Sequence, residues 1–133
     1  MESIRFLPTK IHGALDYIVA IALILAPNIF QFSNAGAAPV WIPRILGVVL
    51  IAYSLFTRYE WGVIKVVAMP YHLMVDLGAS IFLAASPFLF GFAGQSANVW
   101  LPHLVVGITV VLVVLVSKTQ PGEQAGTVRA TAN

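Results

Sequence analysis

The sequence "HGALDYIVAIALILAP" (residues 12–27) decides the fold, because its pattern returns further along the chain as "HLMVDLGASIFLAASP" (residues 72–87). Each stretch is long and apolar, yet each opens with a histidine and has an aspartate four residues later. Residues four apart lie on the same face of a helix. The two stretches therefore predict two related apolar helices, each with one ionisable pair.

The composition is that of a protein dissolved in lipid. Apolar residues make up 59% of the 133 residues, charged residues only 9%, and the mean hydropathy is +0.92. A soluble domain has about 25% charged residues, and a small one needs many polar side chains to cover its surface. With so few charges and a net charge of +2, the chain is not expected to bind nucleic acid. The lack of cysteine excludes disulfides and thiolate metal sites.

Four apolar stretches reach the length of roughly 20 residues that a helix needs to cross a bilayer. They cover residues 11–32, 41–57, 71–92 and 100–117. Since backbone groups in lipid must be paired within the segment, continuous apolar stretches predict helices. The predicted fold class is all-α, an integral membrane four-helix bundle built from two parallel two-helix repeats (about 10–57 and 71–117). We expect one membrane domain over residues 1–118 and a disordered C-terminal tail over residues 119–133.

Matched residues at an offset of 60, and later of 59, define the two repeats. The pairs are His12/His72, Asp16/Asp76, Ile21/Ile81, Leu23/Leu83, Pro27/Pro87, Phe30/Phe90, Phe32/Phe92, Val40/Val99, Trp41/Trp100 and Pro43/Pro102. Because each repeat holds an even number of spans, the repeats run parallel, related by a pseudo-two-fold axis along the membrane normal. The helical stripe with His12 and Asp16 is predicted to face the stripe with His72 and Asp76, while Ile21 and Ile81 point away.

Basic residues predict the orientation. Lysine and arginine gather before the first span, between the second and third spans, and after the fourth. These positions fall on one side of the membrane, so the positive-inside rule predicts a multi-pass inner-membrane protein with both termini in the cytoplasm.

Aromatic and proline residues predict where the helices meet the membrane surfaces. The expected interface anchors are Trp41, Trp100, Tyr59 and Trp61. Pro43 and Pro102 are expected in the first turn of their helices, where proline is tolerated. His103 is expected to extend its polar tip to the headgroups.

The repeated pattern of histidine, aspartate, proline and two phenylalanines, with "SPFLFGF" at residues 86–92, resembles the SPW-repeat integral membrane proteins of bacteria. The likeness covers roughly residues 5–117. Ser86 and Pro87 match the first two letters of the signature, whereas Phe88 stands in place of its tryptophan, and the first repeat keeps only Pro27. The remaining motif positions are Phe90 and Phe92. The resemblance implies a four-helix membrane protein and no particular activity.

Three functions fit the ionisable pairs. The leading hypothesis is a structural or accessory subunit without catalysis, in which polar side chains hold helices together. The first alternative is a small proton- or ion-coupled transporter, because ionisable residues within membrane spans are costly and tend to be functional. The second alternative is a metal-binding membrane protein, with His12, Asp16, His72 and Asp76 as weak candidate ligands.

Neither an enzyme nor a cofactor is expected, because the chain has no nucleotide fingerprint and no Ser-His-Asp order. The expected partner is the lipid bilayer, with a homo-oligomer or a larger membrane complex as a further possibility.

Overall fold

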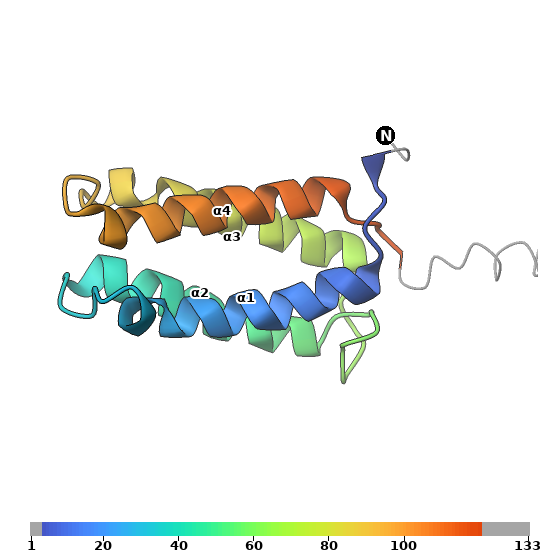
Figure 1. The fold of residues 1–133 in the computed structure, drawn as a ribbon. Helices are drawn as coiled ribbons and strands as arrows, with labels where there is room; N and C mark the ends of the chain where they lie inside the picture. Colours follow the sequence, from blue (N-terminus) through green and yellow to red (C-terminus); the bar gives the residue numbers. More distant parts are fainter. Residues whose placement is uncertain (1–3, 121–133) are drawn as a thin grey trace, which may run out of the picture.

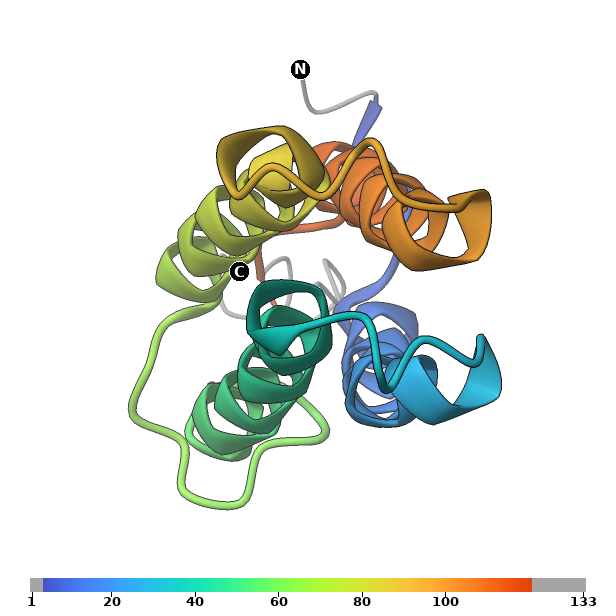
Figure 2. The ribbon, with the colours of Figure 1, turned by 90° about the vertical axis from the view of Figure 1, so that its left-hand side faces the viewer.

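Residues 4–120, the part of the chain that the computed structural model describes, form four helices. They are α1 (Thr9–Ile29), α2 (Ala37–Leu55), α3 (Met69–Leu89) and α4 (Ala97–Val116). The helices lie side by side as two hairpins, α1 with α2 and α3 with α4 (Figure 1). Viewed along their length, all four surround a common centre (Figure 2). The predicted all-α four-helix architecture is thus confirmed.

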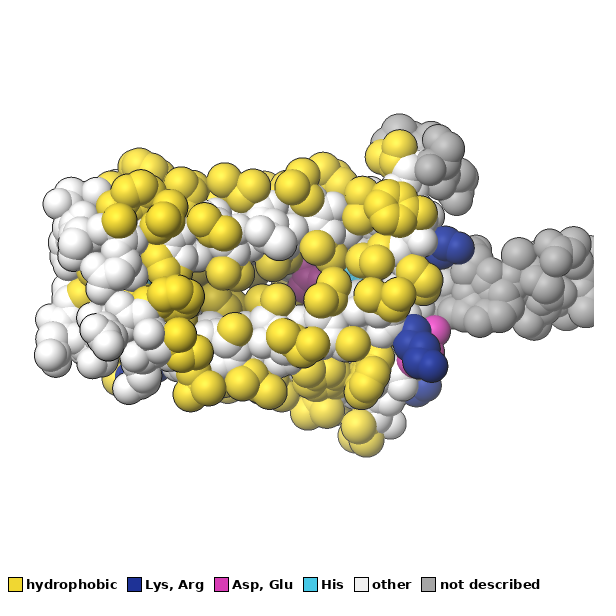
Figure 3. Space-filling model, viewed as in Figure 1, with side chains coloured by type: hydrophobic (Ala, Val, Ile, Leu, Met, Phe, Trp, Pro, Cys, Tyr) yellow, Lys and Arg dark blue, Asp and Glu magenta, His cyan; other side chains and the backbone are white. Residues whose placement is uncertain are grey.

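The outer surface is apolar along most of the bundle (Figure 3). All four helices are long and apolar enough to cross a membrane. Large exposed apolar side chains occur on each of them, among them Ile21 and Ile81, which are 53% and 54% exposed. A soluble bundle would hide such side chains in its interior, so this surface suits contact with lipid. The predicted tail lies outside the described residues, apart from its first two positions.

The first helix of each repeat, α1 or α3, ends in the same way. The backbone N–H of Phe32 donates to the carbonyl of Pro27, and the N–H of Phe92 donates to that of Pro87, each at 2.8 Å. The residue before each phenylalanine has a positive φ, 57° at Gln31 and 72° at Gly91. This is the Schellman arrangement, which satisfies carbonyl groups that the helix end leaves free. It turns Phe32 and Phe92 into the bundle, where both are buried.

The second helices begin earlier than the sequence suggested. Because α2 starts at Ala37 and α4 at Ala97, Pro43 and Pro102 lie inside these helices and not in their first turns. Proline has no backbone N–H, so Pro43 leaves the carbonyl of Pro39 without its usual helical donor. The Nε2 of His103 lies 2.9 Å from that oxygen. The prediction that His103 reaches the headgroups is therefore wrong, because this histidine is buried against the backbone of α2.

The two repeats are joined by a pair of equivalent crossings at one end of the bundle. Leu7, just before α1, forms a parallel β-bridge with Ser117, just after α4. Val67, just before α3, forms the same bridge with Thr57, just after α2. An offset of 60 converts one bridge into the other, as expected for a pseudo-two-fold arrangement. Each bridge places a hydroxyl residue from one repeat beside the first helix of the other.

Glycines allow the close approach within each hairpin. A Cβ added at Gly47 would lie 2.6 Å from the Ala20 carbonyl oxygen, and one at the equivalent Gly107 would lie 2.6 Å from the Ala84 nitrogen. Both neighbours are backbone atoms, which cannot rotate away. A Cβ at Gly78 of α3 would meet nothing within 4 Å. The two hairpins thus depend on glycine at one equivalent position each.

We expect Gly47→Ala and Gly107→Ala each to lower the free energy of unfolding by about 1–3 kcal/mol, because the added methyl forces the helices apart. Gly78→Ala is the matched control and should raise it by about 0.5–1 kcal/mol through the better helix propensity of alanine. Thermal unfolding in detergent, followed by circular dichroism, measures both effects. Equal stability of the Gly107 and Gly78 variants would contradict the close packing.

Candidate functional site

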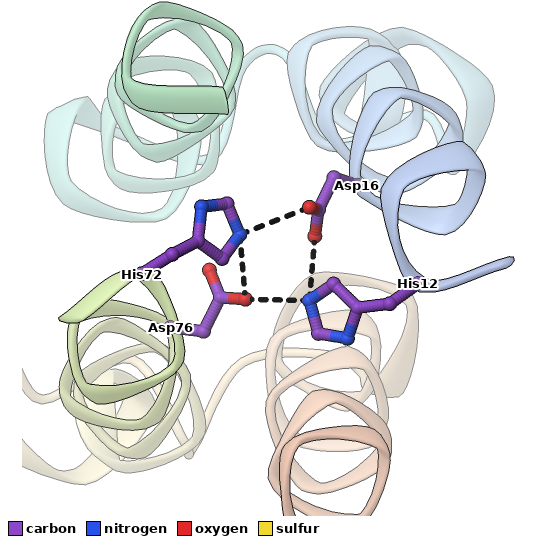
Figure 4. Close-up of side chains that lie close together, drawn as sticks. All are labelled: His12, Asp16, His72 and Asp76. Carbon is purple, nitrogen blue, oxygen red and sulfur yellow. Dashed lines mark hydrogen bonds and ion pairs between the residues drawn. The ribbon is translucent and has the colours of Figure 1, made fainter. Parts of the chain in front are cut away.

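Four ionisable side chains meet at the centre of the bundle, near the end that carries the crossings. His12 and Asp16 come from the first turns of α1, and His72 and Asp76 come from the matching turns of α3. All four are buried, with exposed fractions of 1%, 6%, 0% and 3% respectively. Figure 4 shows the four side chains pointing toward one another between the helices. We call these four residues the His/Asp ring.

The ring is closed and alternates between histidine and aspartate. Within each repeat, the Nε2 of His12 lies 3.2 Å from Asp16 Oδ1, and that of His72 lies 3.1 Å from Asp76 Oδ2. Between repeats, His12 Nε2 lies 2.9 Å from Asp76 Oδ2, and His72 Nε2 lies 2.9 Å from Asp16 Oδ2. The Nε2 atom of each histidine therefore lies near two carboxylates, one from each repeat. The spacing of four residues places each pair on one helical face, and the pseudo-two-fold axis brings the pairs together.

Two hydroxyl groups hold the outer nitrogens of the imidazoles. His12 Nδ1 lies 2.7 Å from Ser117 Oγ, and His72 Nδ1 lies 2.7 Å from Thr57 Oγ1. Each hydroxyl donates its only hydrogen to a carbonyl four residues earlier, on Val113 for Ser117 and on Tyr53 for Thr57. The hydroxyl oxygen must then accept a hydrogen from the imidazole. Both Nδ1 atoms thus carry a proton, and both Nε2 atoms face the ring.

Two tyrosines hold the carboxylates. The hydroxyl of Tyr59 donates to Asp16 Oδ2 at 2.7 Å, and that of Tyr53 donates to Asp76 Oδ1. Tyr59 was predicted to be an interface anchor, but it is only 1% exposed, because the connector between α2 and α3 folds back over the bundle. Burial and the neighbouring Asp16 carboxylate raise the pKa of the Tyr59 phenol. This tyrosine therefore stays a hydrogen-bond donor to the ring.

The other predicted anchors lie at the surface. Trp41 and Trp61 are 52% and 44% exposed, and Trp100 is half-buried. The indole N–H of Trp61 donates to the carbonyl of Lys10 at 2.7 Å, which ties the connector to the start of α1.

The repeat-motif residues occupy the opposite end of the bundle from the ring. Pro27 and Pro87 are buried in the last turns of α1 and α3. Ser86 is buried and donates its hydroxyl hydrogen to the carbonyl of Leu83. Phe88 and Phe90 are exposed by 64% and 52%, so they line the outside, whereas Phe92 is buried. The motif therefore builds the helix end, and none of its residues contacts the ring.

The sequence did not predict that four further residues, Ser117, Thr57, Tyr53 and Tyr59, support the ring. One signal was available, because Thr57 and Ser117 stand at the same offset of 60 as the histidines. The match is overlooked when the two repeats are compared only for identical residues, because threonine and serine differ although both carry a hydroxyl group. The tyrosines have no such signal, because neither one has a tyrosine at its equivalent position.

The model of the SPW repeat domain matches residues 10–117, which cover the four helices except Thr9, the first residue of α1, and include the complete His/Asp ring. The chain belongs to the SPW-repeat family. The predicted resemblance is thus confirmed, and with the four apolar helices it identifies a multi-pass integral membrane protein. No curated protein and no solved structure matches this SPW-repeat protein.

The ring borders an apolar crevice in the bundle. This crevice, of about 50 Å³, is lined by residues of all four helices, among them Asp76 and Tyr53. In Figure 3, acidic atoms are visible at the bottom of the groove between α1 and α4. Apolar packing between the two repeats is thus incomplete at this level.

Proposed function

We propose that this SPW-repeat protein is a structural or accessory membrane component without catalytic activity, and that the His/Asp ring fastens its two repeats together. The observation that carries the proposal is the alternation of the ring, in which each imidazole contacts a carboxylate of the other repeat. The hydroxyl contacts point the same way, because Ser117 supports His12 and Thr57 supports His72 across the interface. Polar contacts between membrane helices act as such fasteners.

A proton-flux measurement separates this proposal from coupled transport. Wild-type protein is reconstituted into liposomes that contain a pH-sensitive dye, and a pH gradient is imposed. We expect the gradient to decay as slowly as in liposomes without protein, and equally slowly with the Asp16→Asn/Asp76→Asn double variant. Faster decay with the wild type that disappears in the double variant would overturn the proposal and favour proton-coupled transport.

We further propose that the end of the bundle with the crossings faces the cytoplasm. Five basic residues lie at this end, in the first turn of α1 or outside the helices: Arg5, Lys10, Arg58, Lys65 and Lys118. Such an excess of basic residues favours the cytoplasmic side. A reporter enzyme fused after Lys118 should be active only in the cytoplasm, and one inserted at Gln95 only on the other side. The reverse pattern would invert the orientation.

The described surface also supports an accessory role alongside other membrane proteins or a second copy of the chain. Its exposed apolar side chains can contact lipid or another transmembrane helix equally well. Mass measurement of the protein in lipid nanodiscs distinguishes a monomer from a homo-oligomer.

A further inference from the structure

We propose that the His/Asp ring binds one divalent transition-metal ion, with the Nε2 atoms of His12 and His72 and one carboxylate oxygen each of Asp16 and Asp76 as ligands. One candidate ligand atom from each residue lies within 4.8 Å of all the others. This site goes beyond the fastening role, because it assigns a ligand to the ring.

The unpaired nitrogen of His72 is the first argument. His72 is 0% exposed, and its Nε2 has no hydrogen-bond partner. Asp16 Oδ2 and Asp76 Oδ2 lie 2.9 and 3.1 Å from this nitrogen, which is within hydrogen-bond distance. The hydrogen bond is missing because an N–H on Nε2 would not point at either oxygen. A doubly protonated imidazole would leave its N–H without an aligned acceptor here, which is costly in a buried site. A lone pair directed at a metal ion between the two carboxylates would remove this problem.

The fixed tautomer of both histidines is the second argument. Metal-binding histidines usually donate the N–H of the other ring nitrogen to a neighbouring acceptor, which orients the ring and presents the lone pair to the ion. Ser117 and Thr57 supply such acceptors at 2.7 Å. Because both hydroxyls pass their own hydrogens to the backbone, they cannot donate to the imidazoles. In its neutral form, each imidazole thus carries its proton on Nδ1 and directs the lone pair of Nε2 into the ring, where His12 Nε2 lies 2.9 Å from Asp76 Oδ2.

The carboxylates have a matching support. Tyr53 donates to Asp76 Oδ1, so Asp76 Oδ2 is available to bind a metal ion. Tyr59 donates to Asp16 Oδ2, so Asp16 Oδ1 is available in the same way. Ligating carboxylates are commonly held in this way by a second hydrogen bond. All four candidate ligands therefore have a buried partner that fixes their orientation.

Charge and size agree with a divalent ion. Two neutral imidazoles and two carboxylates carry a charge of about −2, which a divalent cation balances in a medium where net charge is costly. Ligands of a tetrahedral ion at about 2.1 Å lie about 3.4 Å apart. The widest pair of candidate ligand atoms, within 4.8 Å of each other, would therefore close by about 1.4 Å at most. Mixed nitrogen and oxygen ligands suit zinc, manganese or iron(II), whereas copper(I) prefers sulfur and magnesium or calcium prefer oxygen alone.

Metal retention tests the site directly. Protein purified in detergent is incubated with Zn²⁺, freed of excess metal by desalting, and measured by elemental mass spectrometry. We expect about one zinc ion per chain for the wild type and at least about tenfold less for Asp16→Asn/Asp76→Asn. Glu60→Gln is the matched control, because it removes a carboxylate of the connector outside the ring and should retain the wild-type amount. Folded wild-type protein that retains no more zinc than the double variant would overturn the proposal.

Cobalt provides a second measurement that needs no variant. Wild-type protein loaded with Co²⁺ should show the intense visible absorption of four-coordinate cobalt, whereas only the weak spectrum of hydrated cobalt would refute the site. Ser117→Ala and Thr57→Val should each weaken metal affinity by about 10–100-fold, because they release the orientation of one imidazole. Affinity unchanged in both variants would contradict the assigned roles. Loss of the metal proposal would leave the fastening role intact, because the stability of metal-free Asp76→Ala tests that role separately.

Discussion

Replacing Asp76 with alanine is expected to lower the free energy of unfolding by about 3–5 kcal/mol, as for other buried charges that lose their partner. A single hydrogen bond between membrane helices contributes only about 0.6 kcal/mol on average. Asp76, however, contacts His12 and His72 and also accepts a hydrogen bond from Tyr53. Its removal leaves the two imidazoles to share the single carboxylate of Asp16 and leaves the Tyr53 hydroxyl without its acceptor, and these losses add to one another.

Asp76→Asn is the matched control, because the amide keeps the shape of the side chain and can still accept from Tyr53. It should lose less than half as much stability as the alanine variant. Unfolding in detergent by increasing dodecyl sulfate, followed by tryptophan fluorescence, gives both values. An alanine variant within 1 kcal/mol of the wild type would show that the ring does not hold the repeats together.

Tyr59→Ala is expected to cost a similar amount, about 3–5 kcal/mol, because it removes a fully buried aromatic side chain. Tyr59 packs in a cluster with Met69, Leu73 and Val114, and its hydroxyl donates to Asp16. The variant thus leaves a cavity beneath the connector and an unsatisfied carboxylate oxygen in the ring.

Two further tyrosine variants separate the contribution of the Tyr59 hydroxyl from that of its buried aromatic ring. Tyr59→Phe removes only the hydroxyl and should cost about 1–3 kcal/mol, the range for a buried polar group left without its partner. Tyr71→Ala removes an aromatic side chain that is 65% exposed, and should change stability by less than about 0.5 kcal/mol. The same detergent unfolding measures all three. A Tyr59→Ala variant as stable as Tyr71→Ala would mean that the connector does not close over the ring.

The architecture and the location of the ring could be predicted because both depend on periodicity. Apolar stretches of membrane-spanning length give the helices, and the spacing of His12 to Asp16 gives one helical face. The recurrence of that face at His72 and Asp76 then gives the meeting point, since parallel repeats place equivalent faces against one another.

The remaining details depend on contacts between distant parts of the chain. Tyr59 and Trp61 look alike in the sequence as aromatic residues of a charged connector, but the path of the connector buries one and exposes the other. His103 is buried because Pro43, sixty residues earlier, frees the Pro39 carbonyl beside it. The early starts of α2 and α4 were missed because small residues around Ala37 and Ala97 are also typical of linkers.

The equivalent crossings at Leu7–Ser117 and Thr57–Val67 have an evolutionary consequence. Each half of the molecule supplies the hydroxyl that the histidine of the other half requires, so a half-length ancestor would have found the missing hydroxyl in an identical partner. Gene duplication and fusion would then have converted a symmetric pair of hairpins into one polypeptide without rearranging the interface. The two tyrosines break this symmetry, because the support of Asp76 comes from α2 and that of Asp16 comes from the segment that joins the two halves.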